Sequence, residues 1–306
     1  MVSDVAPALI ALDWGTTSLR GWLLGADGTI LERRAGGPGV MSVPAGGFAA
    51  AYDSFTADWR RDHPVAPAIA SGMVGSRQGW IEAPYVDCPA GFDAVVAGLT
   101  RAAADAPMIV PGVARREAGA MPDVMRGEET QIFGALGDDS GGGAFVLPGT
   151  HSKWAVVERG RIVRFSTWMT GELFAVLRAH SILGRTMPAD GAVPHDGAAF
   201  AAGVRDGLAH GASLPSRLFG VRAGVLLGRL EERGSASFLS GLLIGAEIGA
   251  AVRDAPAGDV VLIGAAGLVA RYAEALTIAG IASRTADPDV TPRGLWRTAR
   301  AAGLVA

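Results

Sequence analysis

Two short polar segments, each set in an apolar run, carry the residue types that suit chemistry on an anion. The first is LDWGTTSLRGWLL at residues 12–24, and the second is LPGTHSKWAVV at residues 147–157. Glycine lets the backbone N–H groups of a turn approach a ligand closely, and neighbouring hydroxyl groups add further donors. Each segment is therefore a candidate site for an oxyanion such as the phosphate of a nucleotide.

The two segments match in residue type and order. Gly15, Thr16 and Ser18 of the first turn (residues 15–18) correspond to Gly149, Thr150 and Ser152 of the second turn (residues 149–152). Each turn follows an apolar segment and precedes a predicted hairpin, so the arrangement occurs once in each half of the chain. Two such turns facing each other would hold one polyphosphate from both sides. Either turn alone is equally compatible with an ordinary hairpin connection.

Side chains beside the turns extend this candidate phosphate site. Asp13 could hold a hydrated Mg²⁺, because that ion prefers one or two carboxylates and keeps several waters; capping a local N–H is the alternative. Arg20 and Lys153 could supply positive charge to a transferring phosphate, although Arg20 also suits a solvated strand. Thr17 and His151 lie within the turns, and a histidine there is also compatible with a plain surface position.

A third glycine segment, VVLIGAAGLVARY at residues 260–272, fits the same ligand. A predicted strand stops at Gly264, Ala265 follows, and Gly267 opens a helix, so the nucleoside end of a nucleotide could lie against bare backbone. The same pattern occurs wherever a helix packs closely on a strand. The chain contains neither a Gly-x-Gly-x-x-Gly fingerprint nor a P-loop.

The elements that must position these turns are strands and helices in alternation. Hairpins are predicted around residues 26–28 and 158–160. Apolar spacing predicts helices over residues 47–61, 126–136, 171–182, 197–209, 217–232 and 236–252, a helix after Gly267, and a short final helix over residues 291–303. The pattern predicts an α/β protein of two domains, residues 1–138 and 139–306, with the boundary near residues 138–143.

Composition and charge exclude several classes of protein. The net charge of −3 is spread along the chain, so no basic stripe indicates binding to nucleic acid. The single Cys88 excludes an internal disulfide framework and favours a reducing compartment. The N-terminus lacks the basic region of a signal peptide, and the apolar stretch 238–252 is too short for a bilayer and contains Glu247. We therefore expect a cytoplasmic protein without a membrane partner; a homo-oligomer is compatible with the sequence.

Taken together, the three glycine segments resemble the two phosphate elements and the adenosine element of the actin-like ATPase superfamily. More narrowly, the chain resembles 2-dehydro-3-deoxygalactonokinases over nearly its whole length. The resemblance lies in LDWGTTSLRGWLL, SGMVGSRQGW, MRGEETQIFGAL, LPGTHSKWA and TWMTGELFAVLRAHSILGR. It implies two ribonuclease-H-like domains flanking a nucleotide cleft, a final helix that returns to the first domain, and ATP and Mg²⁺ as cofactors. It also implies phosphorylation of the 6-hydroxyl of 2-dehydro-3-deoxy-D-galactonate. Leu147 stands where the wider superfamily has an aspartate, so a metal ligand at that place is lost.

Phosphoryl transfer to a hydroxyl also needs a base that receives the proton. Glu128 and Glu129 begin a predicted helix between the two turns, and the phosphatase branch of the superfamily has a similar Gly-Glu-Glu helix start at its catalytic carboxylate. Adjacent helical residues point about 100° apart, so one of the two is expected to face the reaction. The alternative is that both only complement the helix dipole.

The carboxylate of a sugar acid needs a positively charged receptor, and Arg77 is the candidate, with Trp80 for an apolar sugar face. Thr170 and Glu172 begin a predicted helix and could bind sugar hydroxyls, although plain capping is the stronger expectation. Two other functions stay open: a phosphoanhydride hydrolase of the same superfamily and a kinase for a related 2-keto-3-deoxy sugar acid. A nucleotide-dependent regulator is disfavoured, because no basic helix-turn-helix precedes Asp13.

Overall fold

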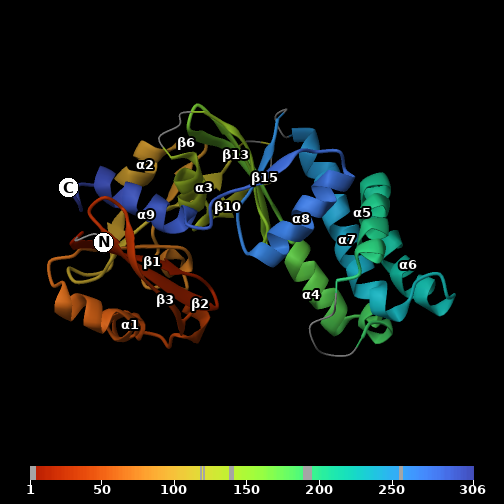
Figure 1. Ribbon diagram of the computed structural model, residues 1–306, viewed down its shortest axis with the longest axis horizontal. Helices are drawn as coiled ribbons and strands as arrows, with labels where there is room; N and C mark the ends of the chain where they lie inside the picture. The colour runs from red at the N-terminus through yellow and green to blue at the C-terminus, as the bar shows by residue number, and fades with distance from the viewer. Residues whose placement is uncertain (1–4, 118, 120, 138–140, 189–194, 255–257) are drawn as a thin grey trace. The chain divides into compact units, whose positions relative to one another are not determined.

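The computed structural model describes residues 5–117, 119, 121–137, 141–188, 195–254 and 258–306. These residues form two compact units, coloured along the chain in Figure 1. The first unit holds Met1–Gly142, Val157–Arg164 and Asp287–Ala306, and the second holds Gly143–Val156 and Phe165–Ala286. The expected boundary near residues 138–143 falls partly on residues 138–140, which lie outside the described residues.

The sheet of the first unit has the order β3-β2-β1-β4-β8-β7. Its strands are β1 (Pro7–Trp14), β2 (Ser18–Gly25), β3 (Ile30–Pro38), β4 (Ala68–Ser71), β7 (Thr100–Arg101) and β8 (Met108–Ile109). The first three strands form an antiparallel meander, and β1, β4 and β8 run parallel. A smaller sheet joins β5 (Tyr85–Asp87), β9 (Gly112–Arg115) and β10 (Asp123–Met125).

A third sheet has the order β15-β14-β11-β12-β13-β6. Its strands are β11 (Gly143–Leu147), β12 (Ser152–Glu158), β13 (Arg161–Trp168), β14 (Val260–Leu262), β15 (Ser283–Thr285) and β6 (Ala90–Gly91). The tip of the β12–β13 hairpin belongs to the first unit, where Arg161 and Ile162 pair with β6. The hairpin turns at Arg159 and Gly160, which both have positive φ angles as a tight hairpin turn requires.

The two large sheets repeat one strand order. With the short edge strands β7 and β6 left out, the remaining five strands of each sheet, counted along the chain, have the order third, second, first, fourth, fifth, and the first, fourth and fifth strands are parallel. This is the ribonuclease-H-like topology, so the expected α/β fold with two such domains is confirmed. The internal repeat that begins at the two polar turns thus extends to the whole sheet around each turn.

The helices follow the predicted pattern with shifted ends. In the first unit they are α1 (Phe48–Asp62), α2 (Phe92–Ala97), α3 (Glu128–Leu136) and α9 (Val290–Ala301). In the second they are α4 (Thr170–His180), α5 (Gly197–His210), α6 (Leu214–Leu226), α7 (Glu232–Ala251) and α8 (Ala266–Ile278). The helix expected to run to residue 232 ends at Leu226, because Gly228 adopts a φ of +68° that terminates a right-handed helix.

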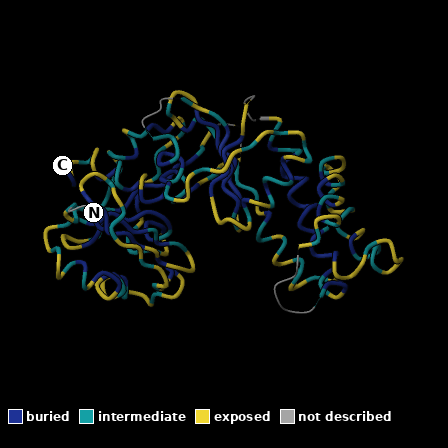
Figure 2. The backbone as a smooth tube through the Cα atoms, in the orientation of Figure 1, coloured by how far each residue is buried: buried dark blue, intermediate teal, exposed yellow. Residues whose placement is uncertain are grey.

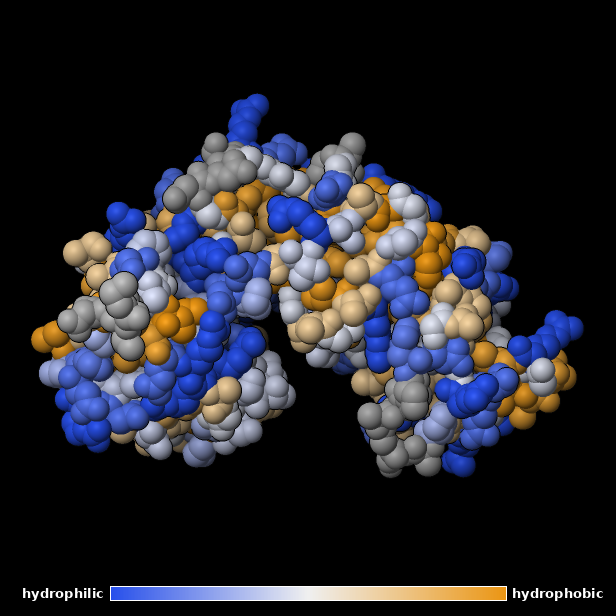
Figure 3. Space-filling model, viewed as in Figure 1, coloured by the Kyte–Doolittle hydropathy of each residue, from blue (hydrophilic) through white to orange (hydrophobic). Residues whose placement is uncertain are grey.

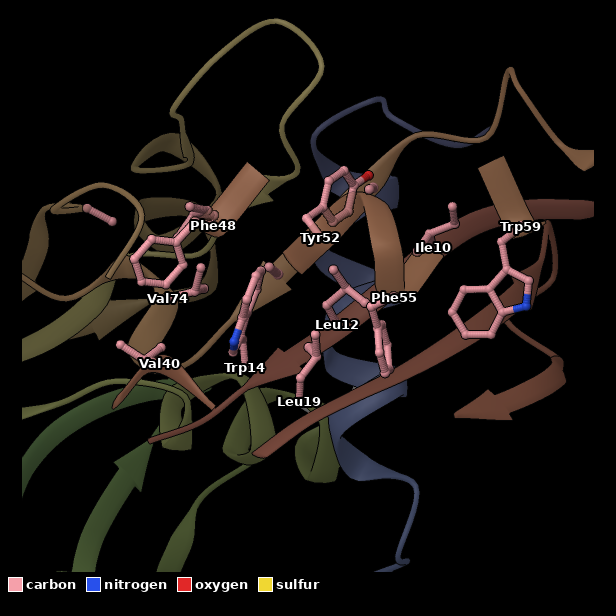
Figure 4. Packing of buried hydrophobic residues seen from close by; sticks show 14 of the residues in the cluster. Ile10, Leu12, Trp14, Leu19, Val40, Phe48, Tyr52, Phe55, Trp59 and Val74 are labelled. Carbon is pink, nitrogen blue, oxygen red and sulfur yellow. The ribbon is translucent and has the colours of Figure 1, made fainter. Parts of the chain in front are cut away.

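Helix α1 supplies the aromatic face that covers the first sheet. Figure 4 shows Phe48, Tyr52 and Phe55 of this helix beside Leu12 and Trp14 of β1. Their rings recur at the three- and four-residue spacing that puts one helix face on a sheet. The strand that leads into the first turn is therefore held on one side by large, fully packed rings, and Figure 2 shows it as mostly buried.

Helix α9 packs against α3 through two close backbone approaches. A Cβ on Gly134 would lie 1.9 Å from the Val290 carbonyl oxygen, and one on Gly294 would lie 2.1 Å from the Thr130 carbonyl oxygen. Both helices therefore belong to the first unit, although the whole of the second unit lies between them in sequence. The helix that begins with the two candidate base residues is fixed from behind by the chain's final helix.

Helix α7 is the most apolar helix of the second unit. Among the described residues it is the one helix that is long and apolar enough to cross a membrane, but 83% of its apolar stretch is buried inside the protein. Glycines 203 and 207 of α5 and glycines 241 and 245 of α7 bring the two helix backbones into contact. The burial identifies α7 as a core helix. The expectation that this apolar stretch is too short for a bilayer was wrong, because the helix has 20 residues and begins at Glu232. By contrast, Phe219, Leu226 and Leu227 on and after α6 are exposed, and Figure 3 shows apolar residues at the surface there.

Candidate active site

The first turn is held in a closed shape by its own backbone. The Gly15 N–H donates to the Ser18 carbonyl over 2.9 Å, and the Val40 N–H donates to the Gly15 carbonyl over 3.0 Å. Gly39 passes so close that a Cβ there would lie 2.2 Å from the carbonyl carbon of Thr17. The three residues after Gly15 are exposed, and this surface is what the turn offers to a ligand.

Asp13 lies one residue before the end of β1, beside the first turn. Its Oδ2 accepts from Arg20 Nη2 over 2.5 Å, and the Asp13 side chain is 15% exposed while that of Arg20 is 52% exposed. In the parallel register Asp13 stands opposite Ser71, and Gly72 approaches so closely that a Cβ there would lie 3.4 Å from Asp13 Oδ1. Asp13 is thus a lone carboxylate with one oxygen in an ion pair and the other beside bare backbone.

The donor set around Asp13 fits a hydrated magnesium ion. The described residues contain no group of three or more His, Cys, Asp or Glu side chains that could enclose a metal. Mg²⁺ does not need such a cage, since it keeps most of its waters and binds through one or two carboxylates together with the phosphates of its nucleotide. Gly72, which lies beside Asp13 Oδ1, places no side chain there.

The second turn is tied to the start of α4. The Glu172 N–H donates to the Thr150 carbonyl over 2.9 Å, and His151 Nε2 lies 2.5 Å from Glu172 Oε2. Thr150 and His151 are exposed. Thr170 is the first residue of α4 and not its N-cap, and its hydroxyl is used within the protein, so the capping role expected of it is not found.

The residues after His151 turn inward. Ser152 is completely buried, and its hydroxyl donates to Glu247 over 2.8 Å. Lys153 is 6% exposed, and its Nζ donates to the Thr167 hydroxyl over 2.8 Å. The exposed part of the second turn is therefore its threonine and histidine, with Gly149 half-buried beside them, while the serine and lysine join the turn to the body of the second unit.

The glycine turn (residues 264–267) lies beside the lead-in to the second turn. Strands β11 and β14 are parallel neighbours, and the Ile263 N–H donates to the Val146 carbonyl over 2.9 Å. Gly264 has a φ of +150°, and a Cβ there would lie 3.3 Å from the Pro148 carbonyl oxygen. Because parallel strands end at the same sheet edge, two of the three predicted ligand-binding turns meet in one place. The first turn lies in the other unit.

The two glutamates at the start of α3 differ in accessibility. Glu129 is completely buried, and its carboxylate accepts from the Gly127 N–H over 2.7 and 3.0 Å and from the Thr130 hydroxyl over 3.0 Å. Glu128 is partly exposed, and its Oε2 accepts from the Arg126 N–H over 2.9 Å. Burial, reinforced by the negative charge of Glu128, raises the pKa of Glu129 from 4.5 to about 7.

The candidate receptor for a sugar acid is the segment from Gly72 to Glu82. Arg77 is on its surface, with a side chain 81% exposed and one contact of 3.4 Å to Glu82. Trp80 is partly buried and packs edge-on against Trp14 of the first core, with ring centroids 6.3 Å apart. Arg77 is therefore available to a ligand, whereas much of Trp80 belongs to the core.

Two residues that the sequence analysis did not select lie beneath these segments. Arg126 is 9% exposed; its Nη2 donates to the Ala83 carbonyl over 2.8 Å, and its guanidinium stacks 4.3 Å from the Tyr85 ring. Its Nε and Nη1 have no hydrogen-bond partner among the described residues. Glu247 is the second, a buried carboxyl on α7. Its signal in the sequence was a lone acid in the most apolar stretch of the chain.

Comparison with known proteins identifies the family of this arrangement. The family model described as 2-keto-3-deoxy-galactonokinase matches residues 13–298, from the carboxylate before the first turn into the final helix. The chain belongs to this kinase family. A "probable 2-dehydro-3-deoxygalactonokinase" of Rhizobium meliloti (strain 1021) is 39% identical over 297 residues, covering 95% of this chain and 96% of that protein. A 2-dehydro-3-deoxygalactonokinase of Escherichia coli (strain K12) is 41% identical over 275 residues, covering 89% and 90%.

Solved structures agree with the family and the fold. A crystal structure of a Sinorhizobium meliloti protein of the same kinase family matches with a TM-score of 0.88 at 38% identity, covering 96% of this kinase and 98% of that chain. An activator of 2-hydroxyisocaproyl-CoA dehydratase from Clostridium difficile, solved with bound ADPNP, matches with a TM-score of 0.53 at 10% identity, covering 96% and 95%. The second likeness concerns the fold alone.

Proposed function

We propose that this kinase transfers the terminal phosphoryl group of ATP to the 6-hydroxyl of 2-dehydro-3-deoxy-D-galactonate, giving the 6-phosphate and ADP in galactonate catabolism. The observation that carries the proposal is the family match over residues 13–298, which includes every candidate turn and the acidic start of α3. The two relatives named as 2-dehydro-3-deoxygalactonokinases support the substrate. The need for ATP makes the cytoplasm the expected compartment, and neither a nucleic acid nor a membrane has a part in the reaction.

The nucleotide is held by the three turns. The backbone and hydroxyls of residues 15–18 bind phosphate in the first unit, and Gly149, Thr150 and His151 bind phosphate in the second. The exposed glycine turn, including Ala265, receives the nucleoside, because its glycines have no side chain that would obstruct the ligand. Backbone donors of this kind are fixed before the ligand arrives, so they stabilise phosphate charge without a cost of reorganisation during the reaction.

Asp13 would hold the Mg²⁺ that accompanies ATP, through water or directly. The ion, when bound, neutralises negative charge on the phosphates. Arg20 pairs with Asp13 and is half exposed, so it keeps the carboxylate oriented and adds positive charge beside the first turn. Lys153 is bound to Thr167 and contributes its charge from a buried position behind the second turn.

Glu128 is the proposed base that receives the proton of the sugar hydroxyl. A base must come within about 3 Å of the atom it deprotonates, and a carboxyl that is 0% exposed, as Glu129 is, cannot do so without a change of structure. Glu129 accepts from the Gly127 N–H and so fixes the backbone at the start of α3. It is a positioning residue for its neighbour.

The carboxylate of the sugar acid binds Arg77, whose guanidinium can take a carboxylate in two parallel hydrogen bonds. The half-buried edge of Trp80 faces the apolar side of the sugar. Glu172 lies in the first turn of α4, with Thr170 behind it, and binds sugar hydroxyls. Arg126 supports the receptor from below through the Ala83 carbonyl and the Tyr85 ring. Charge complementarity between Arg77 and an acid is what separates this site from a site for a neutral sugar.

The test is a coupled assay of ADP release across a panel of 2-keto-3-deoxy sugar acids. The highest kcat/KM is expected for the galactonate-derived acid, with formation of its 6-phosphate. A higher value for the gluconate-derived epimer would make the enzyme a kinase for that related acid. Rapid phosphate release with ATP and no sugar acid would instead favour the hydrolase alternative, in which the carboxylate activates water.

A further inference from the structure

Glu247 is a buried carboxyl that accepts four hydrogen bonds. It lies on α7 and is 2% exposed. Its Oε1 accepts from Ser152 Oγ over 2.8 Å and from Trp154 Nε1 over 2.7 Å. Its Oε2 accepts from the Tyr272 hydroxyl over 2.8 Å and from the Thr170 hydroxyl. All four donors are neutral, so Glu247 is not the partner of a cation in this cluster.

The four donors come from the segments that surround the proposed nucleotide site of the second unit. Ser152 closes the second turn, and Trp154 follows it on β12. Thr170 begins α4. Tyr272 lies on α8, the helix that follows the glycine turn. One carboxyl therefore connects the second turn, the start of α4 and the helix behind the glycine turn.

The number of donors matches what an ionised carboxylate can accept. Two carboxylate oxygens offer about four lone-pair positions, and the indole N–H of Trp154 can only donate. Burial raises the pKa of Glu247, and the four hydrogen bonds oppose that rise. A glutamine would place two N–H donors on one side of the cluster, where Thr170 and Tyr272 now donate. The cluster is thus built for an acceptor on both oxygens.

A purely structural role does not account for the position of this acid. Burying a carboxyl costs free energy that well-packed apolar residues in the same helix do not incur. The other contacts of the second turn are also with the start of α4: the Thr150 carbonyl and the His151 side chain both bond to Glu172. Thr150 and His151 stay exposed while Ser152 is anchored, so the carboxyl fixes the buried end of the turn and leaves its outer part to a ligand.

We propose that Glu247 is the positioning residue of the second turn: by holding Ser152, Thr170 and Tyr272 to one point, it fixes the turn relative to α4 and α8 in the conformation that binds the nucleotide. The proposal rests on the proposed function, because it assumes that this turn binds phosphate. Glu247 is 2% exposed, so we expect it to act through the turn and not by contact with a substrate, and its loss should weaken nucleotide binding more than binding of the sugar acid.

The test compares Glu247→Gln with Ser235→Ala in the full-length enzyme. Ser235 is a fully buried residue of the same helix, and its hydroxyl bonds to the Thr186 and Glu232 carbonyls, away from the turn. We measure the affinity for a non-hydrolysable ATP analogue by calorimetry, the KM of each substrate, kcat and the melting temperature. Losing hydrogen bonds to a charged group predicts analogue binding about tenfold weaker or more for Glu247→Gln, with the KM of the sugar acid within about twofold. Ser235→Ala should lower the melting temperature and leave analogue affinity unchanged.

Analogue affinity within about twofold of wild type in a folded Glu247→Gln variant would overturn the inference. An equal loss of affinity in Ser235→Ala would also overturn it, because the effect would then follow stability alone. If Glu247→Gln does not fold, Tyr272→Phe removes one donor and keeps the ring, and about threefold weaker binding is expected; unchanged binding would overturn the inference. Failure of the wild-type enzyme to bind the analogue would instead refute the proposed function.

Discussion

Gly171 and Gly149 approach each other backbone to backbone: a Cβ on residue 171 would lie 2.3 Å from the carbonyl oxygen of Gly149. The same atom would lie 2.9 Å from the Thr150 Cα. The start of α4 can therefore dock on the second turn only where residue 171 has no side chain. This contact, the Glu172 N–H to Thr150 bond and the Glu247 cluster make the turn and the start of α4 one structural piece.

Gly171→Ala should disturb the second turn without unfolding the protein. The atoms in the way are backbone and cannot move aside cheaply, so overpacking of about 1–3 kcal/mol is expected to raise the KM for ATP about tenfold or more. Gly220→Ala on α6 is the matched control, because a Cβ there meets nothing within 4 Å. Steady-state kinetics check both variants. Equal KM values for the two would show that the close approach has no bearing on nucleotide binding.

Glu128→Gln should abolish most turnover while nucleotide affinity is kept. Loss of a general base typically lowers kcat by about 10²–10⁴-fold. Glu129→Gln is the matched variant one residue away, and we expect a smaller loss of kcat because Glu129 acts through the position of α3. The coupled ADP assay and analogue binding measure the two effects. If both variants turn over at near-normal rates, neither glutamate is the base; if only Glu129→Gln is inactive, the assignment between them is reversed.

The stability of the protein should fall as the pH rises from about 4.5 to about 7 because of Glu129. The pKa of this buried carboxyl is raised from 4.5 to about 7, so in that window the folded state binds more protons than the unfolded state. The free energy of unfolding then decreases with pH, by at most about 1.4 kcal/mol per pH unit for one group. Denaturant unfolding of wild type and Glu129→Gln at several pH values measures the difference.

In Glu129→Gln this component of the pH dependence should vanish. Glu128→Gln provides a second check, since removing the neighbouring charge should lower the pKa of Glu129 and move the upper end of the window to lower pH. Identical pH dependences in wild type and Glu129→Gln would show that Glu129 does not titrate in this range.

Arg77→Ala should raise the KM for the sugar acid and spare kcat. Loss of a hydrogen-bonded ion pair with the substrate carboxylate predicts about a tenfold rise in KM, with kcat and the KM for ATP within about twofold. Arg61→Ala is the control, because Arg61 is also an exposed arginine paired with a nearby acid, Asp62. A sugar-acid KM that does not change in Arg77→Ala would move the carboxylate receptor away from the Gly72–Glu82 segment.

Asp13→Asn should weaken the response to magnesium. With one charge fewer beside the first turn, the Mg²⁺ concentration for half-maximal rate is expected to rise about tenfold. Asp27→Asn in the turn of the following hairpin removes an exposed aspartate that bonds only locally, to Thr29, and is the control. Magnesium titrations at saturating ATP compare the variants, and equal midpoints would exclude Asp13 as the carboxylate that holds the ion.

Much of the fold could be predicted because its signals are local. Alternating and three-to-four spacing identified the hairpins around residues 26–28 and 158–160 and helices such as α1 and α7. Short strands such as β5, β9 and β10 have no comparable period, because three or four residues are too few to show one. The end of α6 was misjudged because the backbone conformation of Gly228, not the apolar spacing, stops the helix.

The sequence by itself determined the family, the duplicated turns and the acidic helix start, because these depend on residue types at fixed spacing. Only the tertiary structure decided which of those residues are accessible. It buried Glu129 and Ser152, left Glu128 and Arg77 at the surface, and brought the Pro148 carbonyl beside Gly264. It also revealed Glu247. Three of its four hydrogen-bond partners are 77 to 95 residues away along the chain, and the fourth, Tyr272, is 25 residues away. Burial and hydrogen-bond partners arise from packing between distant segments, and no local pattern encodes them.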